Sequence, residues 1–331
     1  EACDKDFRTQ YPGDEFCIRP PKKGTGIQLH VGPKSYDDPD EVEPFLVYPG
    51  EEVTECYFLK TSNTENEFYF PRKIRMRPGS HHLISYIIGE DVPDGWGDCN
   101  IGDRRGSFGG AETPIVDYPT NNIEAPENVG LGKVLPRNAQ IKLELHHVNT
   151  TEEPILREAW INVYWKSRDE IDTDVQDMFM LGGLGVNVPG GEHHIYHNSC
   201  KINGDTRIID IFGHFHAHTT RFSAWRVRDG KKDLFYEVYD YHDTPTIAYD
   251  SLTKNKTPDR ENLIPGGWSG ELDIKAGDVI EWECEVDNTS DKTLRYSNEL
   301  YTGEMCNLFG TYTGKSAALL MCNDVGKVTK L

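Results

Sequence analysis

Residues 141–148 read IKLELHHV, and the first six positions alternate between apolar and polar side chains. This period of two predicts a β-strand, because successive side chains of a strand point to opposite faces. Similar short runs recur along the chain, separated by turn markers such as PG, DG and GG. They include IQLHV (27–31), VTECYFL (53–59), AWINVYW (159–165), TRIIDIF (206–212) and VIEWECEV (279–286). No long segment has the period of a helix, so the sequence predicts an antiparallel all-β protein.

The length of the chain and a charged stretch near its middle predict two domains. The chain has 331 residues, which suits two domains at about 150 residues each, although one large all-β domain would also fit. The stretch KSRDEIDTDVQDM (166–178) follows a strong strand pattern, and strand patterns resume after it. We therefore expect two β-sandwiches with jelly-roll or Greek-key links, at 45–170 and 171–331. The segment 1–44 has no assigned role and is expected to pack on the first.

The composition restricts the partners and the compartment. The net charge of −20 predicts that the surface repels nucleic-acid phosphates and anionic lipids. No apolar run is long enough for a membrane span. Eight cysteines, with no CxxC pair among them, suit disulfides in an oxidising compartment better than a zinc ribbon. We therefore expect a secreted or periplasmic protein. Asn-x-Ser/Thr triplets at Asn149, Asn255 and Asn288 arise often by chance and carry little weight.

Histidines gather where their spacing suits a metal ion. In GHFHAH (213–218), the imidazoles of His214, His216 and His218 would share one strand face. His81 and His82 are neighbours, so on a regular strand they would point to opposite faces. Both can reach one ion only where the pleat is broken, at a β-bulge or a strand entry. The RPGS stretch directly before them could provide that break.

Two further stretches extend this pattern. His146, in LELHHV, can supply another imidazole from a separate strand. In GEMCNLFG (303–310), Met305 and Cys306 would face opposite ways. A thioether is a good ligand for Cu(I) and a poor one for zinc, calcium or magnesium, although a single methionine is more often a packing residue. Four other histidines are expected to be ordinary surface or hydrogen-bonded residues: His30, His193, His194 and His197.

Four motifs occur in a fixed order: HH at 81–82, LELHH at 143–147, HFH at 214–216 followed by WRVRDG, and GEMCNLFG at 303–310. This order resembles the ascorbate-dependent type II copper monooxygenases, which include peptidylglycine α-hydroxylating monooxygenase and dopamine β-monooxygenase. The resemblance covers about residues 45–325. It implies two β-sandwich domains with a copper site on each, facing across a cleft.

The resemblance also implies the ligands of two coppers per chain. An electron-supplying copper would be held by His81, His82 and His146. An oxygen-activating copper would be held by His214, His216 and Met305. His216 is preferred to His218 because of its interval to the RDG turn at 228–230. The resemblance further implies three disulfides, Cys56–Cys99, Cys200–Cys322 and Cys284–Cys306, and it assigns no pairing to Cys3 and Cys17.

The implied reaction is the hydroxylation of an activated C–H bond of a small molecule or peptide, with dioxygen and ascorbate as the reductant. It needs no side-chain general base, so no catalytic residue is predicted beyond the metal ligands. Phe212 and Phe309 stand where the peptidylglycine enzymes have carboxylate-binding arginine and tyrosine, while Asn307 is kept. A buried carboxylate without such partners is costly. We therefore expect an apolar or aromatic substrate rather than a peptide ending in glycine.

Two other functions fit parts of the pattern. A copper-binding β-sandwich protein without turnover would keep the same ligands. A zinc enzyme with three histidines, similar to the α-carbonic anhydrases, would use HFH and LELHH. In those enzymes, however, the His-x-His pair comes before the third histidine, and here it comes after. The zinc interpretation also leaves His81, His82 and Met305 unexplained.

Overall fold

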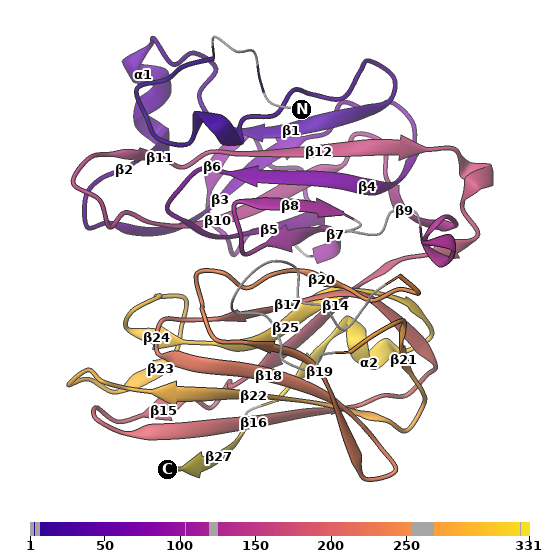
Figure 1. Cartoon of the computed structure of the whole chain (residues 1–331). Helices are drawn as coiled ribbons and strands as arrows, with labels where there is room; N and C mark the ends of the chain where they lie inside the picture. Colours follow the sequence, from indigo (N-terminus) through magenta and orange to yellow (C-terminus); the bar gives the residue numbers. More distant parts are fainter. Residues whose placement is uncertain (1–2, 4–6, 103, 119–124, 253–267, 325) are drawn as a thin grey trace. The chain divides into compact units, whose positions relative to one another are not determined.

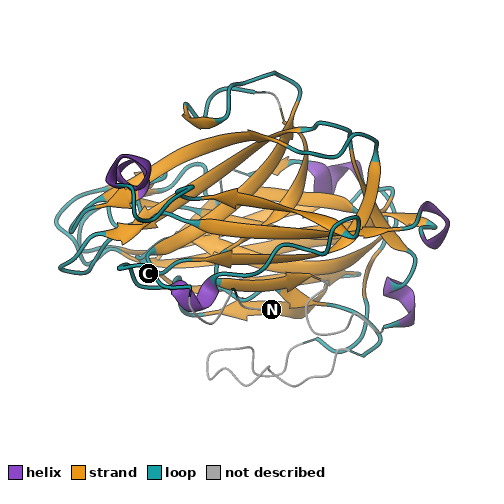
Figure 2. Ribbon diagram, turned by 90° about the horizontal axis from the view of Figure 1, so that it is seen from above, coloured by secondary structure: helices purple, strands orange, loops and turns teal. Residues whose placement is uncertain are grey.

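The computed structural model of the chain describes residues 3, 7–102, 104–118, 125–252, 268–324 and 326–331. It is 52% strand and 6% helix, which confirms the all-β prediction. The chain divides into two compact units (Figure 1), which consist of Glu1–Asn121 with Gly130–Asp172 and of Asn122–Val129 with Thr173–Leu331. Figure 2 shows that strands make up most of the described chain and that helices are short pieces between them.

Two larger sheets and one small sheet form the first unit. One sheet has the order β1 (Gly26–Val31), β12 (Ala159–Lys166), β4 (Glu67–Met76), β9 (Leu131–Leu135), and β8 (Ile115–Tyr118) pairs with β4. The other has the order β6 (Gly95–Gly97), β3 (Glu52–Lys60), β10 (Gln140–Val148), β5 (Ser80–Ile88), β7 (Arg104–Ala111). The small sheet pairs β2 (Leu46–Val47) with β11 (Ile155–Leu156). Both larger sheets contribute to one buried core, which includes Ile161 from β12 and Leu143 from β10.

The second unit begins with β13 (Thr173–Asp174) and also has two larger sheets and a small one. One has the order β20 (Ile247–Ala248), β17 (Thr206–Phe215), β25 (Cys306–Gly314), β14 (Gln176–Gly182), β26 (Cys322–Asn323), and β21 (Leu272–Ile274) pairs with β17. The other has the order β19 (Lys231–Val238), β18 (Thr219–Arg228), β22 (Val279–Asp287), β16 (His193–Lys201), β27 (Lys327–Lys330). The small sheet contains β15 (Asn187–Val188), β23 (Leu294–Tyr296) and β24 (Gly303–Glu304).

The described helices are single turns, of which the first comes before β1 and the others lie between strands. The α-helices are α1 (Pro39–Val42) and α2 (Ala317–Leu320). The 3-10 helices are η1 (Asp14–Phe16), η2 (Glu43–Phe45), η3 (Pro126–Asn128) and η4 (Arg168–Glu170). Within the residues that the structure describes, no helix is long and apolar enough to cross a membrane.

The fold-class prediction of two antiparallel β-sandwich domains is wrong. Two such sandwiches would have four antiparallel sheets, whereas the described strands form six sheets. Two of these sheets are small, and the pairs β14–β26 and β23–β24 are parallel. The physical reason is that strands of two or three residues carry too little alternation to be recognised in a sequence. Their partners, and the direction in which they pair, are decided by the tertiary structure.

The alternation that predicted the strands survives in β22, where buried and half-buried residues alternate along its whole length. It is lost in β10, which contains the stretch IKLELHHV. Lys142 and His146 lie on the face opposite Leu143, and they too are buried. Lys142 donates hydrogen bonds to the carbonyls of Cys99 and Ile101, so a loop covers this second face.

Four disulfides are present, and each lies within one unit. They are Cys3–Cys17 and Cys56–Cys99 in the first unit, and Cys200–Cys322 and Cys284–Cys306 in the second. The predicted disulfide framework is therefore confirmed. The pair to which the resemblance assigned no partner, Cys3 and Cys17, is also joined.

Candidate metal centres

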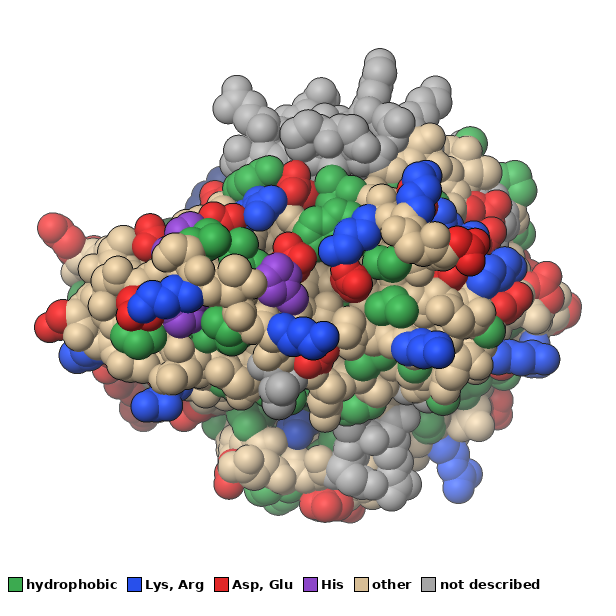
Figure 3. All heavy atoms as spheres, turned by 90° about the horizontal axis from the view of Figure 1, so that it is seen from below, with side chains coloured by type: hydrophobic (Ala, Val, Ile, Leu, Met, Phe, Trp, Pro, Cys, Tyr) green, Lys and Arg blue, Asp and Glu red, His purple; other side chains and the backbone are tan. Residues whose placement is uncertain are grey.

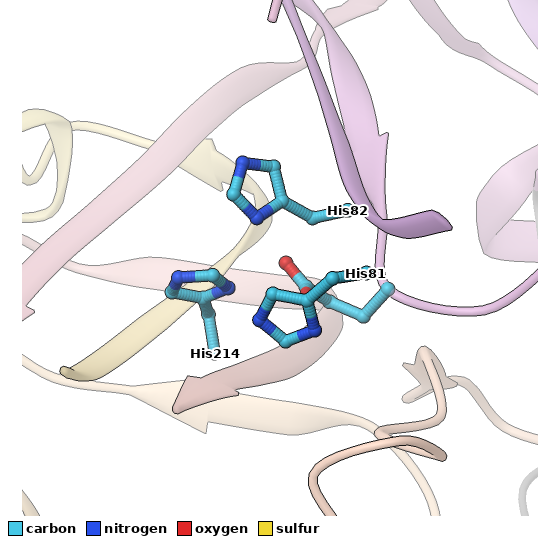
Figure 4. A group of neighbouring side chains, drawn as sticks. His81, His82 and His214 are labelled. Carbon is cyan, nitrogen blue, oxygen red and sulfur yellow. The ribbon is translucent and has the colours of Figure 1, made fainter. Parts of the chain in front are cut away.

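Three histidines of the first unit meet where β5 begins. His82 pairs with His146 across the β5–β10 ladder, and the next pair is Ser80 with His147, so His81 is the extra residue of a β-bulge. This is the break in the pleat that adjacent histidines require. As a result, the side chains of His81 and His82 point to the same side (Figure 4). His214, which Figure 4 also labels, belongs to the second unit.

The three rings are close enough to share one ion. The ring centroids of His81 and His82 lie 5.4 Å apart, and each lies 5.1 Å from that of His146. All three side chains are buried. Nε2 of His146 is 2.8 Å from Oε1 of Glu52, and Nε2 of His82 is 3.3 Å from Oε1 of Glu144. A carboxylate on Nε2 favours the tautomer that carries its proton there, which makes Nδ1 the metal-binding atom.

Glu112 is a fourth donor in this region, and it was missed by sequence reasoning. It directly follows β7, and one ligand atom each of His81, His82 and Glu112 lie within 4.8 Å of one another. Burial raises the pKa of Glu112 well above its usual value, and the charge of His146 opposes this. Its place depends on the β5–β7 pairing, in which Leu83 lies opposite Ala111. The GGAETP stretch carries no signal of that pairing.

The second unit brings together His214, His216 and Met305. His214 lies near the end of β17, His216 follows that strand, and Met305 directly precedes β25. Nε2 of His214 is 3.2 Å from Sδ of Met305, and the ring centroids of His214 and His216 lie 5.3 Å apart. Ligand atoms about 2.0–2.3 Å from a shared ion lie about 3–4 Å from each other, so this spacing fits a common metal. All three residues are buried.

Hydrogen bonds orient this second set. Nδ1 of His216 lies 3.0 Å from the carbonyl of Glu299, which makes Nε2 the metal-binding atom of that ring. Nδ2 of Asn307 lies 3.5 Å from Sδ of Met305. Oδ1 of the same amide accepts a hydrogen bond from the backbone N–H of Gly182. Asn307, expected in a substrate pocket, therefore contacts a candidate ligand directly.

Aromatic side chains border His214. The ring of Phe309 lies 5.9 Å from that of His214, 5.6 Å from that of Phe212 and 5.3 Å from that of Phe179. The three phenylalanines form a buried cluster with Leu181 at its edge. The structure thus places the two predicted phenylalanines together. Phe179 was missed, because β14 comes 33 residues earlier in the chain than Phe212 and only the shared sheet brings them together.

The other histidines lie elsewhere. His147 is fully buried on the opposite face of β10 from His146, and burial lowers the pKa of its imidazole well below the usual value. Nε2 of His218 lies 3.0 Å from the carbonyl of Tyr301, and His242 is exposed beside Asp240. Carboxylates contact the four histidines expected to be ordinary: His30, His193, His194 and His197.

No protein-family model matches the chain, and the search of the curated proteins found no match.

Proposed function

We propose that the protein is a copper-dependent monooxygenase that hydroxylates an activated C–H bond of an apolar or aromatic substrate. Its co-substrates would be dioxygen and an external reductant such as ascorbate. The observation that carries the proposal is the presence of two unlike donor sets in one chain. The first set has three imidazoles, and the second has two imidazoles and a thioether.

The donor atoms favour copper over the common alternatives. Imidazoles bind both copper and zinc, but the thioether of Met305 is a soft ligand that selects Cu(I). A set of three imidazoles accepts either oxidation state of copper. Copper bound at both sets would supply two one-electron centres, which match the two electrons that a monooxygenation consumes.

The chain's own residues would hold and orient these ions. Glu52 and Glu144, beside Nε2 of His146 and His82, would fix two rings of the first set. The carbonyl of Glu299 would fix His216 in the second set. Partners of this kind raise ligand basicity and set ring orientation.

Phe179, Phe212 and Phe309 support an apolar substrate. They form a buried hydrophobic surface whose Phe309 ring lies against His214. An aromatic ring would gain from offset or edge contacts with these rings. A carboxylate would lose its hydration there without a charged partner among the three, which is costly. The proposed substrate is therefore an aromatic or otherwise apolar small molecule.

The compartment follows from the disulfides. Four disulfides within one chain are typical of secreted or periplasmic proteins, because cytosolic thiols are kept reduced. On the face shown in Figure 3, acidic and basic side chains are interspersed. Together with the net charge of −20, this supports small molecules rather than nucleic acid as partners.

Copper stoichiometry tests the proposal first. We expect two coppers per chain after reconstitution and desalting, and one copper in each of Met305→Ala and His82→Ala. The His242→Ala variant, which changes an exposed histidine outside both sets, should retain two. Oxygen consumption driven by ascorbate should then depend on an aromatic substrate and disappear in both single-site variants.

Other outcomes point to the alternatives. Two coppers without ascorbate-dependent turnover on any substrate would support a copper-binding protein. One zinc per chain, unaffected by Met305→Ala, would contradict the proposal.

A further inference from the structure

Glu304 is a fully buried carboxylate that joins two candidate ligands of the second set. It is the last residue of β24 and directly precedes Met305. Its Oε1 accepts a hydrogen bond from the backbone N–H of Met305 at 2.8 Å and another from the backbone N–H of His216 at 2.6 Å. This oxygen atom therefore links its own segment of the backbone to His216, which lies 88 residues earlier in the sequence.

The link lies where the sheet stops holding these segments together. The β17–β25 ladder ends with the pair Phe215 and Cys306. His216 follows Phe215, and Met305 precedes Cys306, so both ligand residues lie just beyond the last ladder pair. The two hydrogen bonds to Glu304 continue the connection by one further residue on each strand.

Burying a carboxylate at this position costs free energy. Glu304 is fully buried, and the backbone N–H groups of His216 and Met305 donate to its carboxylate. Burying an ionisable group costs free energy unless hydrogen bonds or an opposite charge compensate for it. A neutral acceptor would satisfy the same N–H groups at a lower cost. A cation held by His216 and Met305 would add a compensating opposite charge beside the carboxylate.

We propose that Glu304 is a positioning residue, which holds the backbones of His216 and Met305 so that the thioether and the imidazoles converge on one copper. This inference rests on the proposed function, since it assumes that the second set binds copper. Glu304 touches the backbones of the ligand residues, and its effect on the metal would be exerted through them.

Three variants separate hydrogen bonding from charge and from bulk. In Glu304→Gln, the amide oxygen can still accept both N–H groups. In Glu304→Leu, the size is similar and the acceptor is lost. The matched control is Glu237→Leu, because Glu237 is a buried carboxylate of the same unit that accepts from Ser223 Oγ and Tyr239 Oη.

The readouts are the copper–sulfur distance from X-ray absorption of the Cu(I)-loaded protein and the copper affinity of each set from chelator competition. We expect Glu304→Leu to lose the sulfur signal and to weaken the second copper by about 10–100-fold, as found for residues that support metal ligands. Glu304→Gln should restore both properties, and Glu237→Leu should leave both unchanged. The first copper should be retained in every variant.

The proposal is overturned if Glu304→Leu keeps the sulfur signal and the wild-type affinity. Should Glu304→Leu not fold, Glu304→Asp takes its place, because it keeps the charge but withdraws the oxygen by one methylene. Unchanged affinity and sulfur signal in Glu304→Asp would then overturn the proposal. Failure of the proposed function is recognised separately: the wild type itself would show no sulfur signal, and Met305→Ala would bind as much copper as the wild type.

Discussion

His82 and His146 lie opposite each other across the β5–β10 pair, and their ring centroids are 5.1 Å apart. The following pair joins Ser80 to His147, so the ladder gains one residue at His81. On a regular strand, that residue would point away from His82. A single extra residue thus turns two facing imidazoles into a group of three.

The turn before the bulge contains Gly79, where an added methyl group should lower both the stability and the copper affinity. Gly79 has a φ of 87°, and a Cβ there would lie 2.2 Å from Cδ1 of Ile155. We expect Gly79→Ala to lower the free energy of unfolding by about 1–3 kcal/mol, because both backbone strain and the contact oppose it. The shifted turn should also weaken copper at the first set, as measured by chelator competition.

Gly50→Ala is the matched control for this prediction. Gly50 has a similar φ of 79°, but a Cβ there would meet nothing within 4 Å. It should cost about 1 kcal/mol and leave copper binding unchanged. Equal copper affinities in the two variants would show that the turn does not position the bulge.

Replacing Glu52 tests how much copper binding at the first set depends on the carboxylates beside its imidazoles. Oε1 of Glu52 is 2.8 Å from Nε2 of the buried His146. We expect Glu52→Ala to lower copper affinity at the first set by about 10–100-fold, because the ring loses the partner that fixes its orientation and tautomer. Isothermal titration with copper would measure this. The neighbouring exposed Glu51 provides the control, and a loss of the same size in Glu51→Ala would contradict the prediction.

The sequence predicts the parts of the site that depend on local spacing. HH after RPGS indicates a β-bulge or a strand entry, because adjacent imidazoles can share an ion only where the pleat is broken. The register shift at His146–His147 confirms the break. HFH similarly places two imidazoles on one face, whatever its partner strand is. Both features depend on only a few neighbouring residues.

Other parts depend on pairing between distant strands and could not be predicted. Glu112 approaches His81 only because β7 pairs with β5, and Phe179 approaches Phe309 only because β14 pairs with β25. The fold prediction was wrong for the same reason. Alternation shows that a segment such as VIEWECEV is a strand, but it names neither its neighbours nor the sheet that it joins.

Two of the Asn-x-Ser/Thr triplets have a structural role, whereas Asn255 lies outside the described residues. Nδ2 of Asn288 donates to the carbonyls of Val188 and Lys292, and its Oδ1 accepts from Oγ of Ser290. Asn149 makes the equivalent contacts in the first unit, with Val47, Glu153 and Thr151. Both asparagines are buried, so each amide ties a loop to a strand end.

We therefore expect Asn288→Asp to lower the stability, although the side chain keeps its size. The carboxylate would face two carbonyl oxygens that have lost their donor, which costs about 1–3 kcal/mol. Urea denaturation would measure the change. Asn187→Asp, at an exposed position of the same unit, should stay within about 0.5 kcal/mol of the wild type. A change in Asn288→Asp no larger than in this control would contradict the structural role.

The carboxylate of Asp278 should make the stability of the protein depend on pH. Its buried carboxylate accepts from Nε of Arg228 at 2.9 Å, from Nη2 at 2.6 Å and from the backbone N–H of Lys275 at 2.7 Å. Burial would raise the pKa of Asp278, but Arg228 and the Lys275 N–H outweigh it and hold the pKa below the usual 3.8. The folded protein therefore binds this proton less readily than the unfolded chain. The stabilisation is complete above about pH 4 and is lost as the pH falls through the folded-state value.

Asp278→Asn should remove this stabilisation, which is about 1.5–3 kcal/mol near neutral pH for hydrogen bonds to a charged group. The difference in unfolding free energy between the wild type and Asp278→Asn should shrink as the pH is lowered from about 4, because the wild type then loses the same interaction by protonation. Urea denaturation at a series of pH values measures both curves. Asp291→Asn, at an exposed site of the same unit, should follow the wild type throughout. If the gap between the wild type and Asp278→Asn stayed constant down to about pH 3, the carboxylate of Asp278 would not be the source of that pH dependence.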